Sequence, residues 1–399
     1  MKSLTNKQIL LGISGSIAAY KACELVRLLR DAHCEVRVVM TRAATEFVSP
    51  LTFQALSHNE VYRDLLDEKA EAAMGHIELA KWADAILIAP ASANFISRLA
   101  QGRADDLLSA VCLASDAPIA CAPAMNQQMW QDNATQENVT RLAGRNIHIF
   151  GPDSGEQACG DIGPGRMIEP EQILQHVSSL FESGLLSGYN VIVTAGPTRE
   201  PIDPVRYISN RSSGAMGYAI AQAVVEAGAK CTLISGPTHL VTPAKVARID
   251  VITAQQMYEA VMQNAKGSDI FIASAAVADY HPTHYYNEKI KKHEPRLSLE
   301  LERNPDILAD IAKVYPNVFR VGFAAETSDL AQLAKQKLKQ KSMHLIVANN
   351  VARSDIGFDS LDNEVTVYWQ DGEQHLPKAS KQKIARQLIP IIANKLPAV

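Results

Sequence analysis

The chain has 399 residues, which is too long for one ordinary hydrophobic core, so two domains of about 200 residues each are expected. Hydrophobic residues make up 47% of the sequence, charged residues make up 21%, and the formal net charge is -4. A mildly acidic total argues against nucleic acid as the main partner, because proteins that follow a phosphate backbone usually carry a basic face.

The apolar run from Ile9 to Ile13 is too short for a signal-peptide core or a membrane span, and no other stretch reaches about 18 apolar residues. The sequence therefore predicts a cytoplasmic protein without a membrane partner. Six cysteines occur without C-x-x-C or zinc-ligand spacing, so most are expected to be free, buried thiols. Cys159 is the exception, because it lies in a glycine-rich stretch, ACGD, rather than on an apolar face.

The first half of the chain alternates predicted strands with helical patterns. The predicted strands are 8–13, 35–40, 85–89, 118–122 and 146–150. Apolar residues at helical spacing (Ala18, Cys23, Val26 and Leu29) predict a helix over 17–30. This alternation is typical of a doubly wound parallel sheet.

The same alternation of predicted strands and helices begins again in the second half. A strand is predicted at 190–195, followed by a long glycine-bearing loop and a helix over 215–227. Further strands are predicted at 230–235, 269–273, 319–323 and 345–349, with a late hairpin near 364–369. A helical pattern over 169–181 and a linker over 182–188 separate the halves. The sequence thus predicts an α/β protein with two doubly wound, Rossmann-like domains, 1–188 and 189–399.

Three loops of the first half follow predicted strands directly. Residues 14–17 (SGSI) open a helix, and free N–H groups and the helix dipole meet at such a turn. A tight turn with a serine cap explains this loop as well as a phosphate site does, and it lacks the G-x-G-x-x-G pattern of dinucleotide sites. Ser92 and Asn94 follow the predicted strand 85–89, and Asn126 follows 118–122. Loops beyond the carboxyl ends of parallel strands share one crevice.

Five segments occur in a fixed order: GSIAAYK (15–21), GHI (75–77), PASAN (90–94), PAMNQQMW (123–130) and ACGDIGPGRM (158–167). Together they resemble the flavin-containing cysteine decarboxylases, and most closely the phosphopantothenoylcysteine decarboxylases. The resemblance implies a flavodoxin-like domain that holds FMN through Gly15, Ser16, Ile17, Thr41, Ser92 and Asn94. Phe95 departs from the family pattern, which commonly has threonine after PASAN, and this puts one contact to the flavin in doubt.

The decarboxylation chemistry explains the residue types. A cysteine thiol gives no electron sink for loss of CO₂, but its oxidation by a flavin does, and the reduced flavin then returns the hydride. By resemblance, His76 is the general base, Asn126 binds the substrate carboxylate, and Cys159 donates a proton from a mobile flap over 151–167. A lone histidine is more often structural than catalytic, but His76 stands beside a glycine at a helix entry.

The loop 194–210 of the second half is long enough to be functional or disordered, and its prolines make disorder improbable. Residues 212–214 (SSG) precede a helix and form a candidate anion site. Asp279 ends another strand with a carboxylate that suits a ribose or a metal. The run 288–293 (EKIKKH) is basic, and most such runs are solvated surface. Lys337 and Lys341 share one helical face.

This half resembles the bacterial, CTP-using phosphopantothenate–cysteine ligases over about 190–395, most specifically in the block AGPTREPIDPVRYISN. The resemblance implies that Asn210 stabilises an acyl-cytidylate, that Arg206 serves the second half-reaction, and that Lys289 serves CTP activation, with Mg²⁺ assisting and its ligands unknown. The CTP pocket would be formed by Ala273, Ser274, Ala275, Asp279, Lys289, Pro305, Asp306, Ile307, Leu308, Phe323, Lys337 and Lys341.

The resemblance also implies small-molecule substrates (4′-phosphopantothenate, L-cysteine and CTP) and a homo-oligomer, with trimers of the flavin domain and dimers of the ligase domain forming a dodecamer. Two alternatives are open from the residues. An NAD(P)-dependent oxidoreductase would need a glycine fingerprint and an acidic end to its second strand, yet Met40-Thr41-Arg42 stands there. The second alternative is a regulatory flavoprotein without decarboxylase activity. The presence of His76, Asn126 and Cys159 together argues against this alternative.

Overall fold

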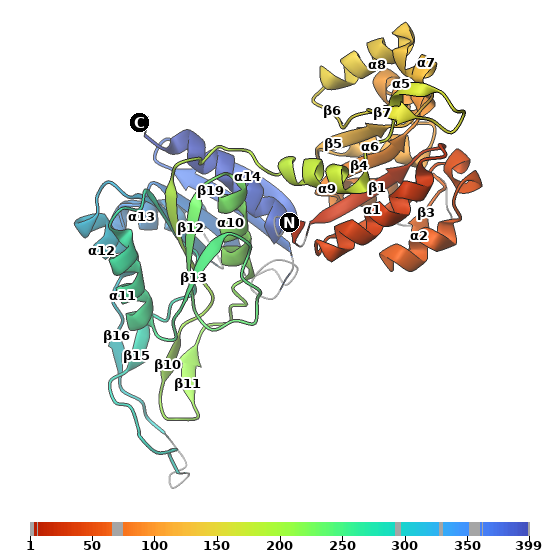
Figure 1. The fold of residues 1–399 in the computed structure, drawn as a ribbon. Coiled ribbons are helices and arrows are strands. Elements are labelled where there is room, and N and C mark those ends of the chain that lie inside the picture. The colour runs from red at the N-terminus through yellow and green to blue at the C-terminus, as the bar shows by residue number, and fades with distance from the viewer. Residues whose placement is uncertain are drawn as a thin grey trace. The chain divides into compact units, whose positions relative to one another are not determined.

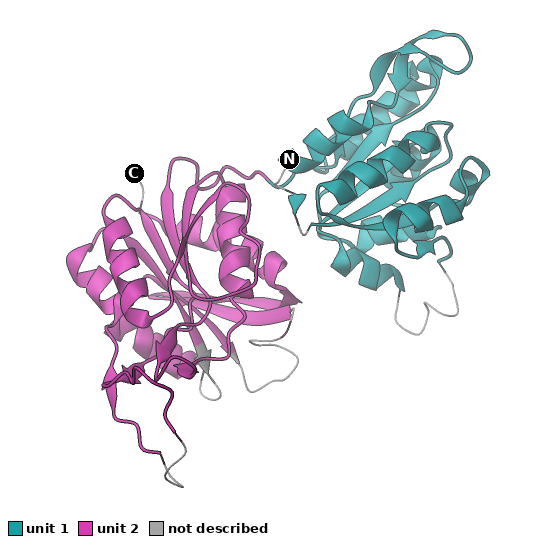
Figure 2. Ribbon diagram, turned by 60° about the horizontal axis from the view of Figure 1, so that its bottom comes forward, with its two compact units in different colours: residues 1–181 teal, residues 182–399 magenta. Residues whose placement is uncertain are grey.

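The computed structural model describes residues 4–5, 7–65, 75–291, 297–326, 330–350, 360 and 362–397. Of the predicted segments, residues 292–293 of the basic run and Thr327 lie outside these ranges. The chain divides into two compact units, Met1–Phe181 and Glu182–Val399, shown in Figure 2. Each unit has its own sheet and its own buried core, as the size of the chain requires.

The first unit contains a parallel sheet with the strand order β3-β2-β1-β4-β5-β6 in the described part of the chain. Its strands are β1 (Gln8–Ile13), β2 (Glu35–Met40), β3 (Val61–Tyr62), β4 (Ala85–Ala91), β5 (Ile119–Pro123) and β6 (His148–Ile149). Its helical segments are α1 (Ala19–Asp31), η2 (Arg42–Glu46), α2 (Pro50–Ser57), α4 (Gly75–Trp82), α5 (Ala93–Gln101), α6 (Leu107–Ala114), α7 (Gln127–Gln131), α8 (Asn133–Ala143) and α9 (Pro170–Ser179). A separate hairpin consists of β7 (Asp153–Glu156) and β8 (Ile162–Arg166).

Alternate residues of the central strands enter two different cores. Ile9 and Leu11 of β1 pack with α1 and α9, whereas Leu10 packs with α4, α5 and α6. Because successive side chains of a strand point to opposite faces, these helices cover both faces of the sheet (Figure 1). Such strands are buried on both sides, and this explains why the sequence reads as continuous apolar runs there.

The second unit contains a larger sheet with the order β13-β12-β9-β14-β17-β18-β19-β20 in its described residues, parallel except for the last two pairings. Its strands are β9 (Asn190–Ala195), β12 (Lys230–Ser235), β13 (Val246–Asp250), β14 (Ile270–Ala273), β17 (Phe319–Glu326), β18 (Leu345–Asn350), β19 (Asp362–Trp369) and β20 (Gly372–Ser380). Its helices are α10 (Ala215–Glu226), α11 (Ala254–Ala265), α12 (Ile307–Val314), α13 (Leu330–Gln340) and α14 (Lys381–Lys395). Two small hairpins pair β10 (Arg199–Pro201) with β11 (Tyr207–Ser209) and β15 (Tyr280–Pro282) with β16 (Leu301–Arg303).

The second sheet is also covered on both faces. Val191 and Val193 of β9 pack with α10 and α14, whereas Ile192 between them packs with α11 and α12. In both units the strand order reverses beside the first strand, between β1 and β4 and between β9 and β14. Ligands of open α/β sheets bind at this reversal, outside the carboxyl ends of the strands. The predicted fold class, two doubly wound α/β domains, is therefore confirmed.

Several details differ from the sequence-based expectations. The loop 194–210 contains the β10–β11 hairpin instead of being free of secondary structure, and β3 and β13 are edge strands that the sequence patterns did not indicate. The predicted linker 182–188 clusters with the second unit, because Leu186 is fully buried in its core and donates its N–H to Ala227. Edge strands and packed linkers depend on tertiary contacts that local sequence patterns do not encode.

The described residues include no helix that is long and apolar enough to cross a membrane. All six cysteines lie in the described ranges as free thiols, and Cys34, Cys112, Cys121 and Cys231 are buried. Burial raises the pKa of Cys121 and of Cys231 to about 12, so these thiols stay protonated at neutral pH. Cys159, by contrast, is exposed.

Candidate active sites

A pocket of 1210 Å³ opens at the strand reversal of the first unit. The loops after β1, β2, β4 and β5 form its floor, and the β7–β8 hairpin contributes Gln157, Cys159 and Gly165. Eight of the residues predicted for this half line it: Gly15, Ser16, Ile17, Thr41, Ser92, Asn94, Asn126 and Cys159. The pocket thus joins segments that lie up to about 150 positions apart in the sequence, as expected at the carboxyl edge of a parallel sheet.

Ser14 fastens the two loops that flank the strand reversal. Its hydroxyl donates to the Pro90 carbonyl oxygen at 2.8 Å and accepts from the Ser92 N–H at 2.8 Å. Ser92 in turn caps α5 by accepting from the Phe95 N–H at 3.4 Å. A buried hydroxyl that both donates and accepts a hydrogen bond is held in one orientation. The Ser14 side chain therefore fixes the spacing between the loops after β1 and β4.

One observation indicates that these loops suit a polar ligand, and a second shows that two of them pack closely together. The Thr41 hydroxyl is buried, lines the pocket and has no hydrogen-bond partner among the described residues. A buried hydroxyl without a partner lowers the stability of the folded state by roughly 1–3 kcal/mol unless a ligand or water forms a hydrogen bond with it. Gly15 lies so close to Ala43 that an added Cβ would collide with the Ala43 side chain. Glycine at position 15 therefore lets the loop after β1 approach the segment after β2 closely.

Asn126 points its amide donor into the pocket. It is the N-cap of α7, and its Oδ1 accepts from the Gln128 N–H at 2.8 Å, which turns Nδ2 outward. Nδ2 faces Gln157 Oε1 at 3.3 Å, Cys159 Sγ at 3.6 Å and Asp161 Oδ2 at 3.3 Å. The cap geometry therefore fixes a neutral donor beside the exposed thiol.

The β7–β8 hairpin docks onto the residues on either side of Asn126. Met125 donates its N–H to the Gly165 carbonyl at 2.9 Å, and the Gln157 side-chain Oε1 accepts from the Gln127 N–H at 3.0 Å. Gly165 has φ +129°, and a Cβ there would collide with the Met125 carbonyl oxygen. The hairpin position that brings Cys159 to the pocket consequently requires glycine at 165.

Two charged groups on the pocket wall were not assigned a role from the sequence. Lys21 is 9% exposed, donates to the Met167 carbonyl at 3.1 Å and pairs with Glu169 at 2.8 Å, and so ties α1 to the end of the hairpin. The sequence did indicate a role for Lys21, because this residue lies one turn before Leu25 on the buried face of α1. A buried lysine needs partners for its charge.

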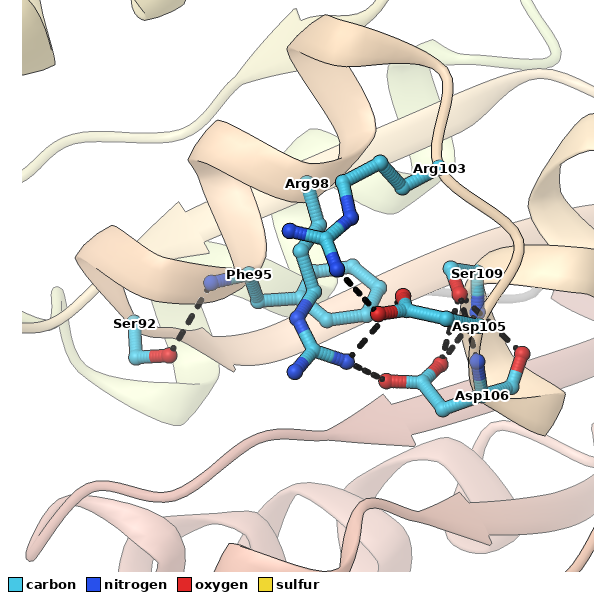
Figure 3. A network of polar contacts seen from close by, with 7 residues as sticks. All are labelled: Ser92, Phe95, Arg98, Arg103, Asp105, Asp106 and Ser109. Atoms are coloured by element: carbon cyan, nitrogen blue, oxygen red, sulfur yellow. Dashed lines mark hydrogen bonds and ion pairs between the residues drawn. The ribbon is translucent and has the colours of Figure 1, made fainter.

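Arg98 belongs to the network in Figure 3. Its guanidinium contacts Asp106 at 2.8 Å and Asp105 at 3.3 Å, and Asp105 also pairs with Arg103 at 2.6 Å. Asp106 caps α6 through the Ser109 N–H, so the network fixes the turn from α5 to α6 at the pocket wall. The Phe95 ring is only 2% exposed and packs in the core on this side, while its N–H is held by Ser92.

His76 is the one predicted catalytic residue of this half that does not line the pocket. It lies half-buried in the first turn of α4, directly after residues outside the described ranges. The structure of one chain therefore brings Asn126 and Cys159 together and leaves His76 apart from them.

In the second unit, three loops converge at the strand reversal. Gly196 after β9 accepts from the Ala276 N–H at 2.9 Å, and Gly214 at the start of α10 lies so near that an added Cβ would be 3.2 Å from the Gly196 backbone. Asn210 reaches the same place, because its Nδ2 donates to the carbonyl oxygens of Ala276 at 3.3 Å and Val277 at 3.1 Å. Asn210 thus contacts the loop that follows β14, directly after the predicted residues Ala273, Ser274 and Ala275.

The buried carboxylate of Asp203 organises the tip of the β10–β11 hairpin. It pairs with the Arg206 guanidinium at 2.9 Å and accepts from the N–H groups of Val205 and Arg206 at 2.8 Å and of Ile290 at 3.2 Å. Arg206 also donates to the Ile290 carbonyl at 2.7 Å. One carboxylate therefore holds Arg206 against the backbone of Ile290, the residue that follows Lys289. Sequence reasoning missed Asp203, although an acidic residue between two prolines in a specific block was a signal.

The remaining predicted nucleotide residues fall into two groups. Asp306 caps α12 and pairs with Lys341 at 3.0 Å, which joins the start of α12 (Pro305, Ile307, Leu308) to the end of α13, where Lys337 also lies. Asp279 is exposed at the end of the loop after β14. Phe323 packs on the core of α10 and α14, on the other face of the sheet from Leu308. No group of three or more His, Cys, Asp or Glu side chains in the described ranges is arranged to hold a metal ion.

Sequence comparisons place the chain among known proteins. Residues 1–182 match the family described as Flavoprotein, and residues 186–396 match the DNA/pantothenate metabolism flavoprotein C-terminal domain. Three relatives named coenzyme A biosynthesis bifunctional protein CoaBC come from Haemophilus influenzae (54% identical, 97% of each chain), Vibrio vulnificus (52%, 98% of each) and Escherichia coli (50%, 98% of each). Identity of this level over nearly the full length shows common descent of both units. The chain belongs to the CoaBC family of coenzyme A biosynthesis bifunctional proteins.

Proposed function

We propose that the second unit ligates cysteine to 4′-phosphopantothenate with CTP through an acyl-CMP intermediate, and that the first unit decarboxylates the product to 4′-phosphopantetheine with FMN. The observation that carries this proposal is the single pocket lined by all six predicted flavin residues together with Asn126 and Cys159. Its 1210 Å³ exceed the roughly 300–1,000 Å³ of ordinary ligand pockets, so a flavin and a substrate fit together.

The pocket residues fit a flavin phosphate. The unpartnered Thr41 hydroxyl and the loop of Gly15, Ser16 and Ile17 at the start of α1 supply polar groups where an anion is favoured. When bound, FMN supplies hydride transfer from and to the substrate carbon that bears sulfur. In this proposal Asn126 Nδ2 binds the substrate carboxylate, and as a neutral amide it holds that carboxylate without opposing its loss. Cys159 lies within reach of the same donor and provides the proton of the last step.

His76 completes the site if the chain forms the proposed trimer. In one chain it does not line the pocket, so a neighbouring copy would supply it as general base. This arrangement places the flavin at a subunit boundary. The dimer of the ligase unit, and a dodecamer built from both contacts, are part of the same proposal.

In the ligase unit, the loops at the strand reversal support a nucleotide site. In this proposal Asn210, whose amide donates to the carbonyls of Ala276 and Val277, contacts the acyl-cytidylate. Arg206, held by Asp203 and by the Ile290 carbonyl, and Lys289, which precedes Ile290 in the chain, supply positive charge. Lys337 and Lys341 add positive charge near α12 for the triphosphate. Mg²⁺ in nucleotide sites takes most of its ligands from phosphates and water, so few protein carboxylates are required. Phe323 is the member of the set that fits least, because its ring packs on the other face of the sheet.

The test is a nucleotide-dependence assay with the purified full chain, cysteine and 4′-phosphopantothenate. We expect pyrophosphate release with CTP, little release with ATP, and CO₂ release that follows it. Pyrophosphate without CO₂ from a yellow protein would support the regulatory flavoprotein instead, at least for the first unit. Absence of both products would contradict the proposal.

The Gly165→Ala variant tests whether hairpin position controls decarboxylation. The added Cβ would collide with the Met125 carbonyl and displace the hairpin that carries Cys159. Because misplacement of a reacting group by about 1 Å costs on the order of 100-fold, we expect CO₂ release from supplied substrate to fall by about 10- to 100-fold with ligase activity unchanged. Gly102→Ala is the control, since Gly102 also has positive φ but open space around it. Equal effects of the two variants would contradict the role of the hairpin contact.

A further inference from the structure

The carboxylate of Asp161 bridges the two pocket groups that the proposed decarboxylation uses. Its Oδ2 accepts from Asn126 Nδ2 at 3.3 Å and from the Cys159 thiol at 3.4 Å. Asp161 closes the turn of the β7–β8 hairpin, where its carbonyl oxygen accepts from the Gln157 N–H at 2.8 Å. The hairpin turn therefore brings a negative charge to two groups that line the pocket, Asn126 and Cys159, although Asp161 itself does not line it.

The orientation of Asn126 makes this contact specific for an acceptor. Its Oδ1 is already used by the Gln128 N–H, so Nδ2 is the group that faces the pocket. Nδ2 has two hydrogens and three facing acceptors, Gln157, Cys159 and Asp161. A carboxylate makes the strongest of these hydrogen bonds because it is charged. A substrate carboxylate arriving at Nδ2 must then compete with Asp161.

We propose that Asp161 is a positioning residue that occupies, in the substrate-free site, the place on Asn126 where the substrate carboxylate binds. This inference rests on the proposed decarboxylase function. Two carboxylates at one amide repel each other, so Asp161 moves away when the substrate binds and returns to Asn126 when CO₂ has left. The hairpin that carries Asp161 is thereby coupled to the presence of a carboxylate on the ligand. A ligand without a carboxylate, such as the product 4′-phosphopantetheine, leaves Asp161 on Asn126.

The surroundings support displacement of Asp161 at low cost. Asp161 and Cys159 are exposed, and no cation within the described residues pairs with Asp161. Arg166, the basic residue of β8, is paired with Glu169 at 3.5 Å. The Asp161 charge is therefore not tied into an ion pair that substrate binding would have to break.

The experiment compares Asp161→Asn and Asp161→Ala with the wild-type full chain, using phosphopantothenoylcysteine as substrate and 4′-phosphopantetheine as inhibitor. We expect KM for the substrate to fall about three- to tenfold in both variants and Ki for the product to stay unchanged, because the variants remove a competitor for the carboxylate alone. Asp153→Asn is the control, since Asp153 is an exposed carboxylate at the start of the same hairpin whose side chain accepts from the Ser154 N–H and not from Asn126 or Cys159. A purely structural role of Asp161 would raise KM instead.

An unchanged or higher KM would overturn the inference, and so would an equal fall of KM and Ki, which would indicate a reshaped pocket. In both cases the wild type still releases CO₂ and the proposed function stands. Wild-type protein that releases no CO₂ from supplied substrate would overturn the proposed function and this inference together.

Discussion

The His76→Asn variant is expected to lose CO₂ release by at least about 100-fold while it keeps its yellow colour and its ligase activity. General base catalysis contributes about 10²- to 10⁴-fold, and asparagine keeps the shape of the side chain without its basicity. His76 is not one of the residues proposed to hold FMN (Gly15, Ser16 and Thr41 among them), so FMN binding should be unaffected. His33→Asn is the control, because His33 is exposed and its backbone has the positive φ that asparagine tolerates.

Co-expression of two inactive variants tests where His76 acts. If a neighbouring copy supplies His76, oligomers that mix His76→Asn with Cys159→Ser contain some pockets with both native groups, and CO₂ release returns in part. Mixed Asn126→Ala and Cys159→Ser chains should stay inactive, since these two residues lie in the same pocket of one chain. Recovery in neither mixture would place His76 within its own chain or outside catalysis.

The Asp203→Asn variant is expected to lower ligase kcat/KM by about 100- to 1,000-fold, with decarboxylation of supplied substrate unchanged. The buried carboxylate makes a charged hydrogen bond to Arg206 and another to the Ile290 N–H, and each such bond contributes about 1.5–3 kcal/mol. Since about 1.4 kcal/mol is a factor of ten, a loss of about 3 to 4 kcal/mol from the two bonds, toward the lower end of their combined range, predicts this decrease. Asp250→Asn is the control, because the Arg248–Asp250 pair is exposed on its acidic side. Near-normal ligation by Asp203→Asn would contradict the role of this carboxylate.

The direction in which pH affects the contacts of the Asp203 carboxylate follows from its pKa. Burial by itself would raise the pKa of Asp203, but the N–H groups of Val205, Ile290 and Arg206 and the Arg206 charge outweigh it and lower that pKa. A lowered pKa means that the contribution to stability is complete above the ordinary aspartate range, near about pH 4, and is lost only as the pH falls through the lower folded value. Ligase activity should therefore show no loss from Asp203 protonation between pH 5 and 8, as a rate profile on supplied substrates would reveal.

The strand–helix alternation was readable from the sequence because buried parallel strands are continuous apolar runs with β-branched residues. Strands β1, β2, β9 and β12 begin and end where the sequence predicted. The edge strands β3 and β13 were not predicted, because short strands on a sheet edge have weak local patterns and are formed by pairing with β2 and β12. The hairpins β7–β8 and β10–β11 lie in glycine- and proline-rich segments, which local propensity marks as loops.

Residue types and their order along the chain determined the fold class and the family, and they identified side chains such as Asn126, Cys159 and Asn210 as candidates. Only the tertiary structure decided which of them meet. It brought Asp161 to Asn126 and Cys159, and Asp203 to Arg206 and Ile290, while leaving His76 outside the pocket of its own chain. The physical reason is that backbone patterns encode local conformation, whereas the partner of a buried or capping polar group depends on how distant loops pack together at a sheet edge.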